Sequence, residues 1–171
     1  MSTLVTPTYT AGAMPWSEED LAEYDPPDRI RRLPSWLSGQ VAETGAGLVA
    51  GALAAEGLRR QHFVVLSALA ERGAASQAAL GRRLLIDRSD MHALLSELER
   101  DGLVERVRDP NDRRRMLVEL TPAGARILKR LDSRIEGAQE ALLAPLSTAD
   151  RRELERLLTQ LVEHHSRGPA G

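Results

Sequence analysis

The segment Arg106-Val-Arg-Asp-Pro-Asn-Asp-Arg-Arg-Arg-Met-Leu-Val-Glu-Leu-Thr121 decides the fold that we expect for this chain. Two short runs with β-strand character, Leu103–Arg108 and Met116–Leu120, flank its polar tip. Pro110 and Asn111 favour a turn there, because proline fixes φ and asparagine forms tight local hydrogen bonds. The segment therefore predicts a cationic β-hairpin, thin enough to reach a phosphate backbone or a groove. A hairpin whose charges only protect a sheet edge would look the same, so the neighbouring segments have to decide.

Three helices are predicted before the hairpin: Leu58–Gly73, Ser76–Leu85 and Arg88–Arg100. Ser76 and Asp87 are suitable N-caps, and Gly73 is a suitable C-terminal stop. Each helix carries an apolar stripe at helical spacing. The stripes consist of Phe63, Val65, Leu66 and Leu69, then Ala79, Leu80 and Leu84, and then Met91, Leu94, Leu95 and Leu98.

The order helix, helix, helix, hairpin predicts a winged helix-turn-helix over residues 58–120. In this motif the later helix enters the major groove and presents its N-terminal residues to the bases. Free N–H groups at the starts of the two short helices can also hold phosphates. The candidate DNA-contacting residues are Ser76, Gln77, Arg88, Ser89, Asp90, His92, Arg106, Asp112, Arg113, Arg114 and Arg115. If Arg88 and Ser89 are only the first turn of a packed helix, this interpretation loses its major-groove contacts.

The flanking segments, residues 34–57 and 121–165, predict long helices that one chain cannot bury alone. The first, Pro34–Glu56, contains several glycines and requires close packing against another helix. The second starts at Thr121 and Pro122, extends to Leu143, and is followed by a last helix from Ser147. A second copy of the chain would cover their apolar positions, so we expect a homodimer. These positions are Trp36, Leu37, Val41, Leu48 and Leu53 in the first helix and Leu154, Leu157, Leu158, Leu161 and Val162 in the last.

Charge and composition restrict the remaining choices. The net charge is −2, but residues 1–28 contribute −6, whereas residues 76–130 hold twelve basic and nine acidic side chains. We interpret residues 1–33 as an acidic, proline-containing arm, with one or two helical turns possible at Ser17–Tyr24 and with Trp16 able to dock on the body. The chain has no cysteine, no secretion-signal pattern and no apolar run of the ~18 residues that a membrane span needs. We therefore expect a mainly helical, cytoplasmic protein with no membrane partner.

The run Asp109-Pro-Asn-Asp-Arg-Arg-Arg-Met-Leu-Val-Glu-Leu-Thr-Pro-Ala-Gly124 resembles the wing signature of the MarR family of bacterial transcriptional regulators. Ile86-Asp-Arg-Ser89 and Leu98-Glu-Arg-Asp-Gly-Leu-Val-Glu-Arg106 resemble the same family. The resemblance covers roughly residues 34–165. It implies an obligate homodimer that acts as a repressor and binds a pseudo-palindromic operator.

The same resemblance assigns roles within the wing and marks two departures. It implies that Asp112 orients Arg114, that Arg114 enters the minor groove, and that Arg113 lies near the backbone. Asp90 and Ala93 stand where such proteins often carry threonine and a basic residue. Asp90 can accept from a cytosine amine, but it costs affinity near phosphate.

The effector remains open at this stage. The family often binds small phenolic or anionic effectors between its dimerisation helices and its DNA-binding region, and the lack of cysteine argues against a thiol-based peroxide sensor. Candidate effector or zinc residues are His62, His164, His165 and Trp36. We expect no required cofactor and no enzymatic activity, because no catalytic motif or phosphate loop is present. A zinc-responsive regulator of the same fold and a winged-helix protein-interaction module are the alternatives.

Overall fold

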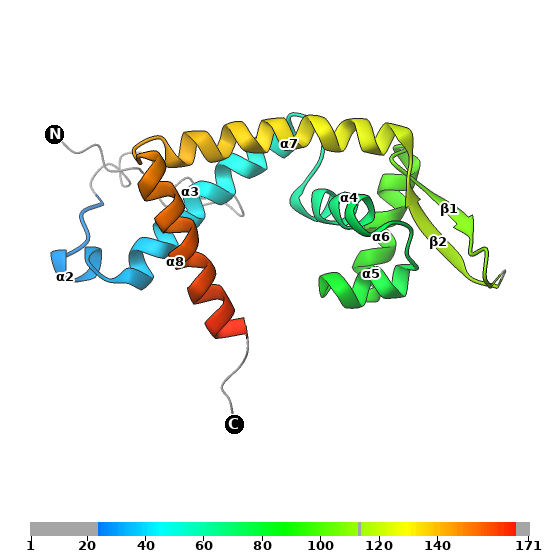
Figure 1. Cartoon of the computed structure of the whole chain (residues 1–171), viewed down its shortest axis with the longest axis horizontal. Helices are drawn as coiled ribbons and strands as arrows, with labels where there is room; N and C mark the ends of the chain where they lie inside the picture. Colours follow the sequence, from blue (N-terminus) through cyan, green and yellow to red (C-terminus); the bar gives the residue numbers. More distant parts are fainter. Residues whose placement is uncertain (1–23, 113, 167–171) are drawn as a thin grey trace, which may run out of the picture.

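The computed structural model describes residues 24–112 and 114–166 and shows an elongated, mainly helical molecule with one hairpin (Figure 1). The elements follow the order α2 (Asp28–Arg31), α3 (Pro34–Ala54), α4 (Arg60–Arg72), α5 (Gln77–Leu84), α6 (Arg88–Arg100), β1 (Val104–Arg108), β2 (Met116–Leu120), α7 (Pro122–Leu143) and α8 (Thr148–Ser166). The predicted fold class, a winged helix-turn-helix between helical ends, is confirmed.

Helix α7 runs along the length of the molecule and joins two regions that differ in packing (Figure 1). At one end, residues 58–120 form the winged lobe, which comprises α4, α5, α6 and the hairpin. At the other end lie α2, α3 and α8. We refer to α3, α7 and α8 as the terminal helices, because they flank the lobe in sequence.

The helix starts follow from the capping residues that the sequence indicates. The Thr121 hydroxyl accepts a hydrogen bond from the Gly124 N–H at 3.0 Å and donates to the Gly102 carbonyl at 2.7 Å. It therefore starts α7 and fastens it to the end of α6. The Ser147 hydroxyl accepts from the Asp150 N–H at 3.2 Å at the start of α8.

Helix α2 lies within the segment that the sequence indicated as an irregular arm. Its first turn is closed by the Pro27 carbonyl, which accepts from the Ile30 N–H at 2.8 Å. Arg31 forms ion pairs with Asp25 and Asp28 at 3.0 and 3.1 Å. The proposed arm up to residue 23, with the docking of Trp16 and most of the helical turns at 17–24, lies outside the described residues.

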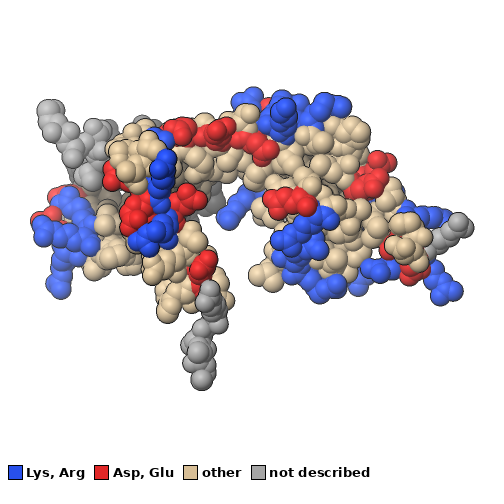
Figure 2. All heavy atoms as spheres, viewed as in Figure 1, with Lys and Arg blue, Asp and Glu red and all other residues tan. Residues whose placement is uncertain are grey.

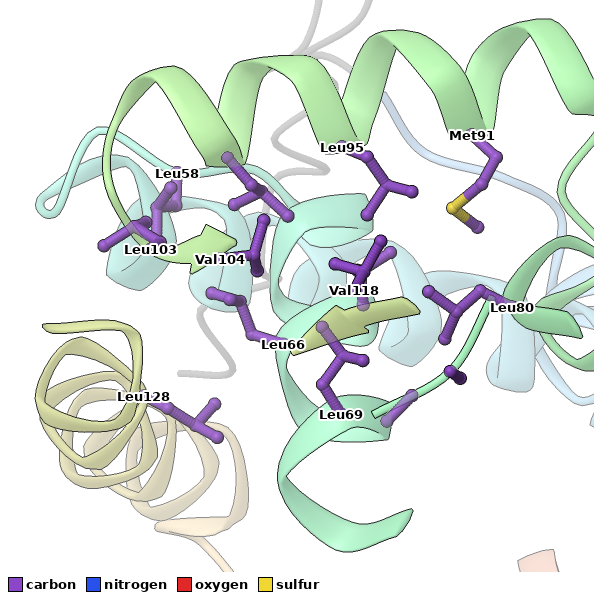
Figure 3. Close-up of a cluster of buried hydrophobic side chains, with 14 of the residues drawn as sticks. Leu58, Leu66, Leu69, Leu80, Met91, Leu95, Leu103, Val104, Val118 and Leu128 are labelled. Carbon is purple, nitrogen blue, oxygen red and sulfur yellow. The ribbon is translucent and has the colours of Figure 1, made fainter. Parts of the chain in front are cut away.

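The winged lobe encloses the hydrophobic core. Leu66, Leu80, Leu95, Leu98 and Val118 are almost completely buried, and Figure 3 shows side chains from α4, α5, α6 and the strands converging on one cluster. All four positions of the predicted stripe on α6 are buried. Phe63 departs from the prediction for α4, because it is only partly buried and packs at the edge of the core.

The terminal helices leave most of their predicted apolar faces uncovered. In α3 only Leu53 is buried, whereas Leu37 and Val41 are about half exposed at 47% and 49%. Helix α8 has no buried residue, and open space separates it from the winged lobe below α7 (Figure 2). The described part of the chain therefore leaves this face of α8 uncovered, which agrees with the expectation that one chain cannot bury the helix alone.

Glycine permits close packing at two helix contacts. A Cβ on Gly45 would lie 3.1 Å from Leu142 Cδ2, where α3 packs along α7. A Cβ on Gly124 would lie 2.1 Å from the Leu103 carbonyl oxygen, so α7 begins directly against the base of the hairpin. Gly39 and Gly51, in contrast, face open space. The predicted need for small residues in the first helix is thus confirmed at Gly45 only among these positions.

No helix among residues 24–112 and 114–166 is long and apolar enough to cross a membrane.

Candidate nucleic-acid interface

The turn between α5 and α6 brings the starts of the two helices together. The Ser76 hydroxyl caps α5 by accepting from the Ala79 N–H at 3.3 Å. Leu85 caps the C-terminus of α5 in the left-handed conformation, and the Ile86 N–H donates to the Gly81 carbonyl at 3.0 Å. The Gln77 amide then donates to the Arg88 carbonyl at 3.3 Å, which ties the first turn of α5 to the first turn of α6.

Asp87 controls the exposed start of α6. Its Oδ1 accepts from the Ser89 N–H at 2.7 Å, from the Asp90 N–H at 3.1 Å and from the Ser89 hydroxyl at 2.6 Å. These hydrogen bonds, that from the Ser89 hydroxyl foremost, lower the pKa of the Asp87 carboxyl. The prediction that free N–H groups hold a phosphate here is wrong for Ser89 and Asp90, because their donors are already taken.

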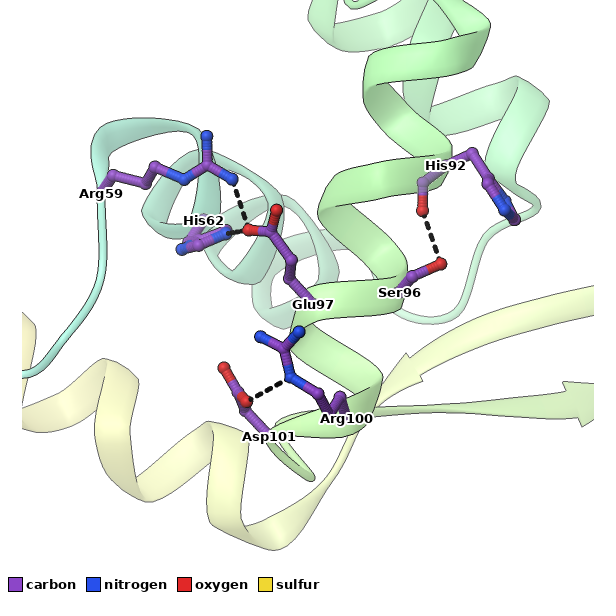
Figure 4. Close-up of polar contacts among 7 residues, drawn as sticks. All are labelled: Arg59, His62, His92, Ser96, Glu97, Arg100 and Asp101. Carbon is purple, nitrogen blue, oxygen red and sulfur yellow. Dashed lines mark hydrogen bonds and ion pairs between the residues drawn. The ribbon is translucent and has the colours of Figure 1, made fainter.

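The outer face of α6 is polar and accessible. Arg88, His92, Ser96 and Arg100 recur every four residues, all exposed, on the side of the helix that the buried leucines do not occupy. The Ser96 hydroxyl donates to the His92 carbonyl at 2.8 Å, and the His92 side chain lies on the other side of α6 from His62 (Figure 4). Asp90 and Ala93 are also exposed. This face can therefore present donors and acceptors to base edges.

The hairpin pairs β1 with β2 in antiparallel register, with Val104 opposite Leu120 and Arg108 opposite Met116. An isolated bridge adds Ala75, whose N–H donates to the Val118 carbonyl at 3.0 Å and whose carbonyl accepts from the Val118 N–H at 2.8 Å. The bridge fixes the wing relative to the start of α5. The bridge was not predicted, because a single bridging residue has no periodic pattern in the sequence.

The wing tip is closed by two aspartates. The Asp109 side chain, nearly buried, accepts from the Asn111 N–H at 2.9 Å. Asp112 Oδ1 accepts from the Arg114 N–H at 3.1 Å, and the Asp112 carbonyl accepts from the Arg115 N–H at 2.9 Å. Asp112 therefore holds Arg114 through its backbone and leaves its guanidinium free to project.

Cationic side chains gather around this tip and on the lower side of the winged lobe (Figure 2). Arg114 and Arg115 are exposed, while Arg113 lies outside the described residues. Arg106 differs from them, because its Nε is 3.1 Å from Glu99 Oε2 on α6. It was expected at the DNA, but in this structure its charge is matched by a local carboxylate.

His62 connects α4 to the middle of α6. It is 5% exposed, and its Nε2 lies 2.8 Å from Glu97 Oε2, which also accepts from Arg59 (Figure 4). The hydrogen bond from Arg59, followed by that with His62, lowers the pKa of the Glu97 carboxyl. The sequence did not indicate this cluster, since its members are 35 to 38 residues apart.

The other proposed effector or metal residues lie apart from this cluster. His164 and His165 stack edge to face at the end of α8 with ring centroids 4.9 Å apart, and Trp36 is partly buried in the first turn of α3. Within the part of the chain that the structure describes, no three histidine, aspartate or glutamate side chains are grouped so as to hold a metal ion.

Comparison with known proteins identifies relatives of this chain. The model of the MarR family matches residues 56–115. The putative transcriptional regulatory protein for the hcr operon of Thauera aromatica is 33% identical over 115 residues, which are 67% of this chain and 69% of that relative. The homoprotocatechuate degradative operon repressor of Escherichia coli is 30% identical over 105 residues, 61% of this chain and 71% of the relative.

Two solved structures show the same arrangement. The PcaV transcriptional regulator of Streptomyces coelicolor, in complex with its natural ligand, superimposes with a TM-score of 0.62 at 30% identity, covering 78% of this chain and 94% of that one. A mutant MarR of E. coli in complex with operator DNA superimposes with a TM-score of 0.64 at 26% identity, covering 75% and 92%.

Proposed function

The chain belongs to the MarR family of transcriptional regulators, and we propose that it acts as a homodimeric repressor whose two winged lobes bind a pseudo-palindromic operator. The main support for this proposal is the geometry of the wing tip. Asp112 closes the tip through the Arg114 backbone, which leaves two exposed guanidinium groups at the end of a narrow hairpin. A guanidinium presented in this way suits a minor groove or a phosphate backbone.

Helix α6 supplies the proposed major-groove contacts. Arg88 can pair with guanine or with a phosphate, and His92 and Ser96 offer further polar groups along the same face. The Ser89 hydroxyl donates to Asp87, so we assign Ser89 the role of an acceptor towards DNA. Arg106 positions the wing against Glu99 rather than contacting a base.

The uncovered faces of α3 and α8 support the homodimer. Half-exposed Leu33, Leu37 and Val41 follow one another every four residues, and α8 adds a second stripe of four large apolar side chains, Leu157, Leu158, Leu161 and Val162. Two copies related by a two-fold axis would cover both stripes. That symmetry places the half-sites about one helical turn apart, ~34 Å.

We also propose that a small phenolic or anionic effector modulates DNA binding, and that the protein acts in the cytoplasm, where its operator lies. The PcaV complex with its natural ligand shows that a structural relative binds a ligand. Zinc is the alternative effector, through His62 or through His164 and His165. Thermal unfolding of the protein with aromatic acids and with zinc distinguishes the two, since a ligand of the folded state raises the midpoint.

The test of DNA binding compares Arg114→Ala with Lys129→Ala, which removes an exposed cation from α7. The probe is a duplex that the wild-type protein selects from a randomised library. We expect Arg114→Ala to weaken binding roughly tenfold to a hundredfold and Lys129→Ala to leave it nearly unchanged. Wild-type affinity must fall steeply with salt. If no duplex is selected, the winged lobe serves as a protein-interaction module; equal affinities for the two variants would remove the role of the wing.

A further inference from the structure

Leu85 combines two unfavourable features at the turn between α5 and α6. It is 93% exposed, more than any other large hydrophobic residue that the structure describes. Its φ is +54°, and within the same part of the chain every other residue with positive φ is a glycine, at positions 57, 73 and 102. A leucine in the left-handed conformation is strained, because its Cβ approaches the following carbonyl oxygen.

The folded chain alone gives no reason for a leucine at this position. The local requirement is a left-handed C-cap, which glycine or asparagine meets without strain. The leucine side chain does not join the core either, although its neighbour Ile86 packs against it. At position 81 in α5, by contrast, glycine suits the structure, since a Cβ on Gly81 would lie 3.0 Å from the Ile86 carbonyl oxygen. Strain of this kind at an exposed position points to a role in a complex.

The surroundings of Leu85 indicate which partner it meets. It follows exposed Arg82 and Arg83 at the end of α5 and precedes exposed Arg88 at the start of α6. The exposed carboxylates of Asp87 and Asp90 offset part of this charge, but the three arginines leave it net positive. Such a surface with one projecting apolar side chain is suited to duplex DNA, whose phosphates are anionic. The apolar group that the major groove offers is the 5-methyl group of thymine.

We propose that Leu85 packs against a thymine methyl group at the edge of each half-site and thereby contributes to sequence specificity. This inference rests on the proposed DNA-binding function, and it adds an apolar contact from the turn to the polar contacts from α6 and the wing. Leu85 thus distinguishes thymine by an apolar contact with its methyl group rather than by a hydrogen bond.

The experiment removes either side of the contact. In the duplex selected by the wild-type protein, each thymine is replaced in turn by deoxyuridine, which lacks only the methyl group. Affinities are measured for the wild type, Leu85→Gly and Leu85→Met. We expect one thymine in each half-site at which loss of the methyl group weakens wild-type binding about fourfold. Leu85→Met should keep this sensitivity, and Leu85→Gly should lose it.

Two further readouts separate the possible failures. The unfolding temperature of Leu85→Gly should equal or exceed that of the wild type, because the strained residue is gone, so weaker binding cannot be ascribed to misfolding. A Leu85→Gly variant that binds as tightly as the wild type, or that remains sensitive to the same thymine, would overturn the inference while leaving the proposed function intact. A wild-type protein that selects no duplex would overturn both.

Discussion

The winged lobe and the terminal helices contain similar apolar periodicities, yet one closes its own core and the other does not. In the lobe, Leu66 and Leu95 pack from facing helices, and the strands contribute Val104 and Val118. In α8, four large apolar residues on one face stay between 43% and 64% exposed. The same pattern of residues therefore has two different structural consequences, depending on what the chain places opposite it.

The difference shows how folding and assembly are divided along this sequence. The lobe brings α4, α5, α6 and the hairpin together within residues 58–120, so each apolar face meets another from the same chain. Helix α3 meets only α7 extensively, and α8 meets no element of the described chain extensively. We infer that the lobe is stabilised within one chain, whereas the terminal helices are stabilised mainly by a second copy.

The largest effect is expected where α7 meets the base of the wing. Gly124→Ala places a methyl group against the Leu103 carbonyl oxygen and the Leu120 side chain. The Leu103 oxygen belongs to the backbone, so it cannot move aside as the end of a flexible side chain can. The variant should lose about 3 kcal/mol of stability in thermal unfolding. Gly137→Ala, in the same helix but with nothing within 4 Å, is the matched control and should be neutral or slightly stabilising. Equal thermal unfolding midpoints for the two variants would show that the contact between α7 and the base of the wing is not closely packed.

A smaller effect, of a different kind, is expected in α8. Leu161→Asp places a charge in the exposed apolar stripe, which lines an open hollow together with Leu157 and His164. The free energy of dimerisation should become less favourable by about 2 kcal/mol, roughly thirtyfold in the dissociation constant. The lobe should still unfold cooperatively. Thr159→Asp adds the same charge about 200° around the helix from Leu161 and serves as the control. The dissociation constants of both variants are measured by sedimentation. A dimer unaffected by Leu161→Asp would place the interface elsewhere.

A pH dependence distinguishes the charges of the two regions. Arg59 and His62 hold the pKa of Glu97 below 4.5, so this group stabilises the folded lobe above about pH 4.5 and ceases to do so as the pH falls through its folded-state pKa. We expect the melting temperature of the wild type to fall more steeply than that of Glu97→Gln below pH 4.5. If the melting temperatures of the two proteins changed in parallel with pH, the ion pairs that join α4 to α6 would not contribute to stability.

The smallest effect is expected for the corresponding change in α8. Arg156 lowers the pKa of Glu153 in the same way, but the two residues lie one turn apart on one exposed helix. Such a pair links no separate elements and contributes little. Glu153→Gln should therefore leave the melting profile between pH 3 and pH 7 almost unchanged. A change as large as that of Glu97→Gln would remove the distinction between the two regions.

The sequence was most informative where local chemistry determines structure. Caps at Ser76, Asp87 and Thr121 located three helix starts, and the alternation around the turn at Pro110 located both strands. The fold class followed from the order of these elements. The position of the exposed polar side of α6 followed from its buried stripe, because a helix that buries one face exposes the other.

The sequence was less informative where distant residues meet. The Glu97 cluster joins positions 35 to 38 residues apart, and the partner of Arg106 comes from the end of the preceding helix. The left-handed conformation of Leu85 was also hidden, because leucine is a typical interior helix residue rather than a C-cap.

Sedimentation equilibrium of the wild-type protein at micromolar concentration tests whether a second copy of the chain completes the terminal helices. We predict a single species with twice the chain mass of 18.8 kDa, and a larger fraction of monomer for Leu161→Asp but not for Thr159→Asp. If the wild-type protein sediments as a folded 18.8 kDa monomer, the terminal helices do not need a second copy.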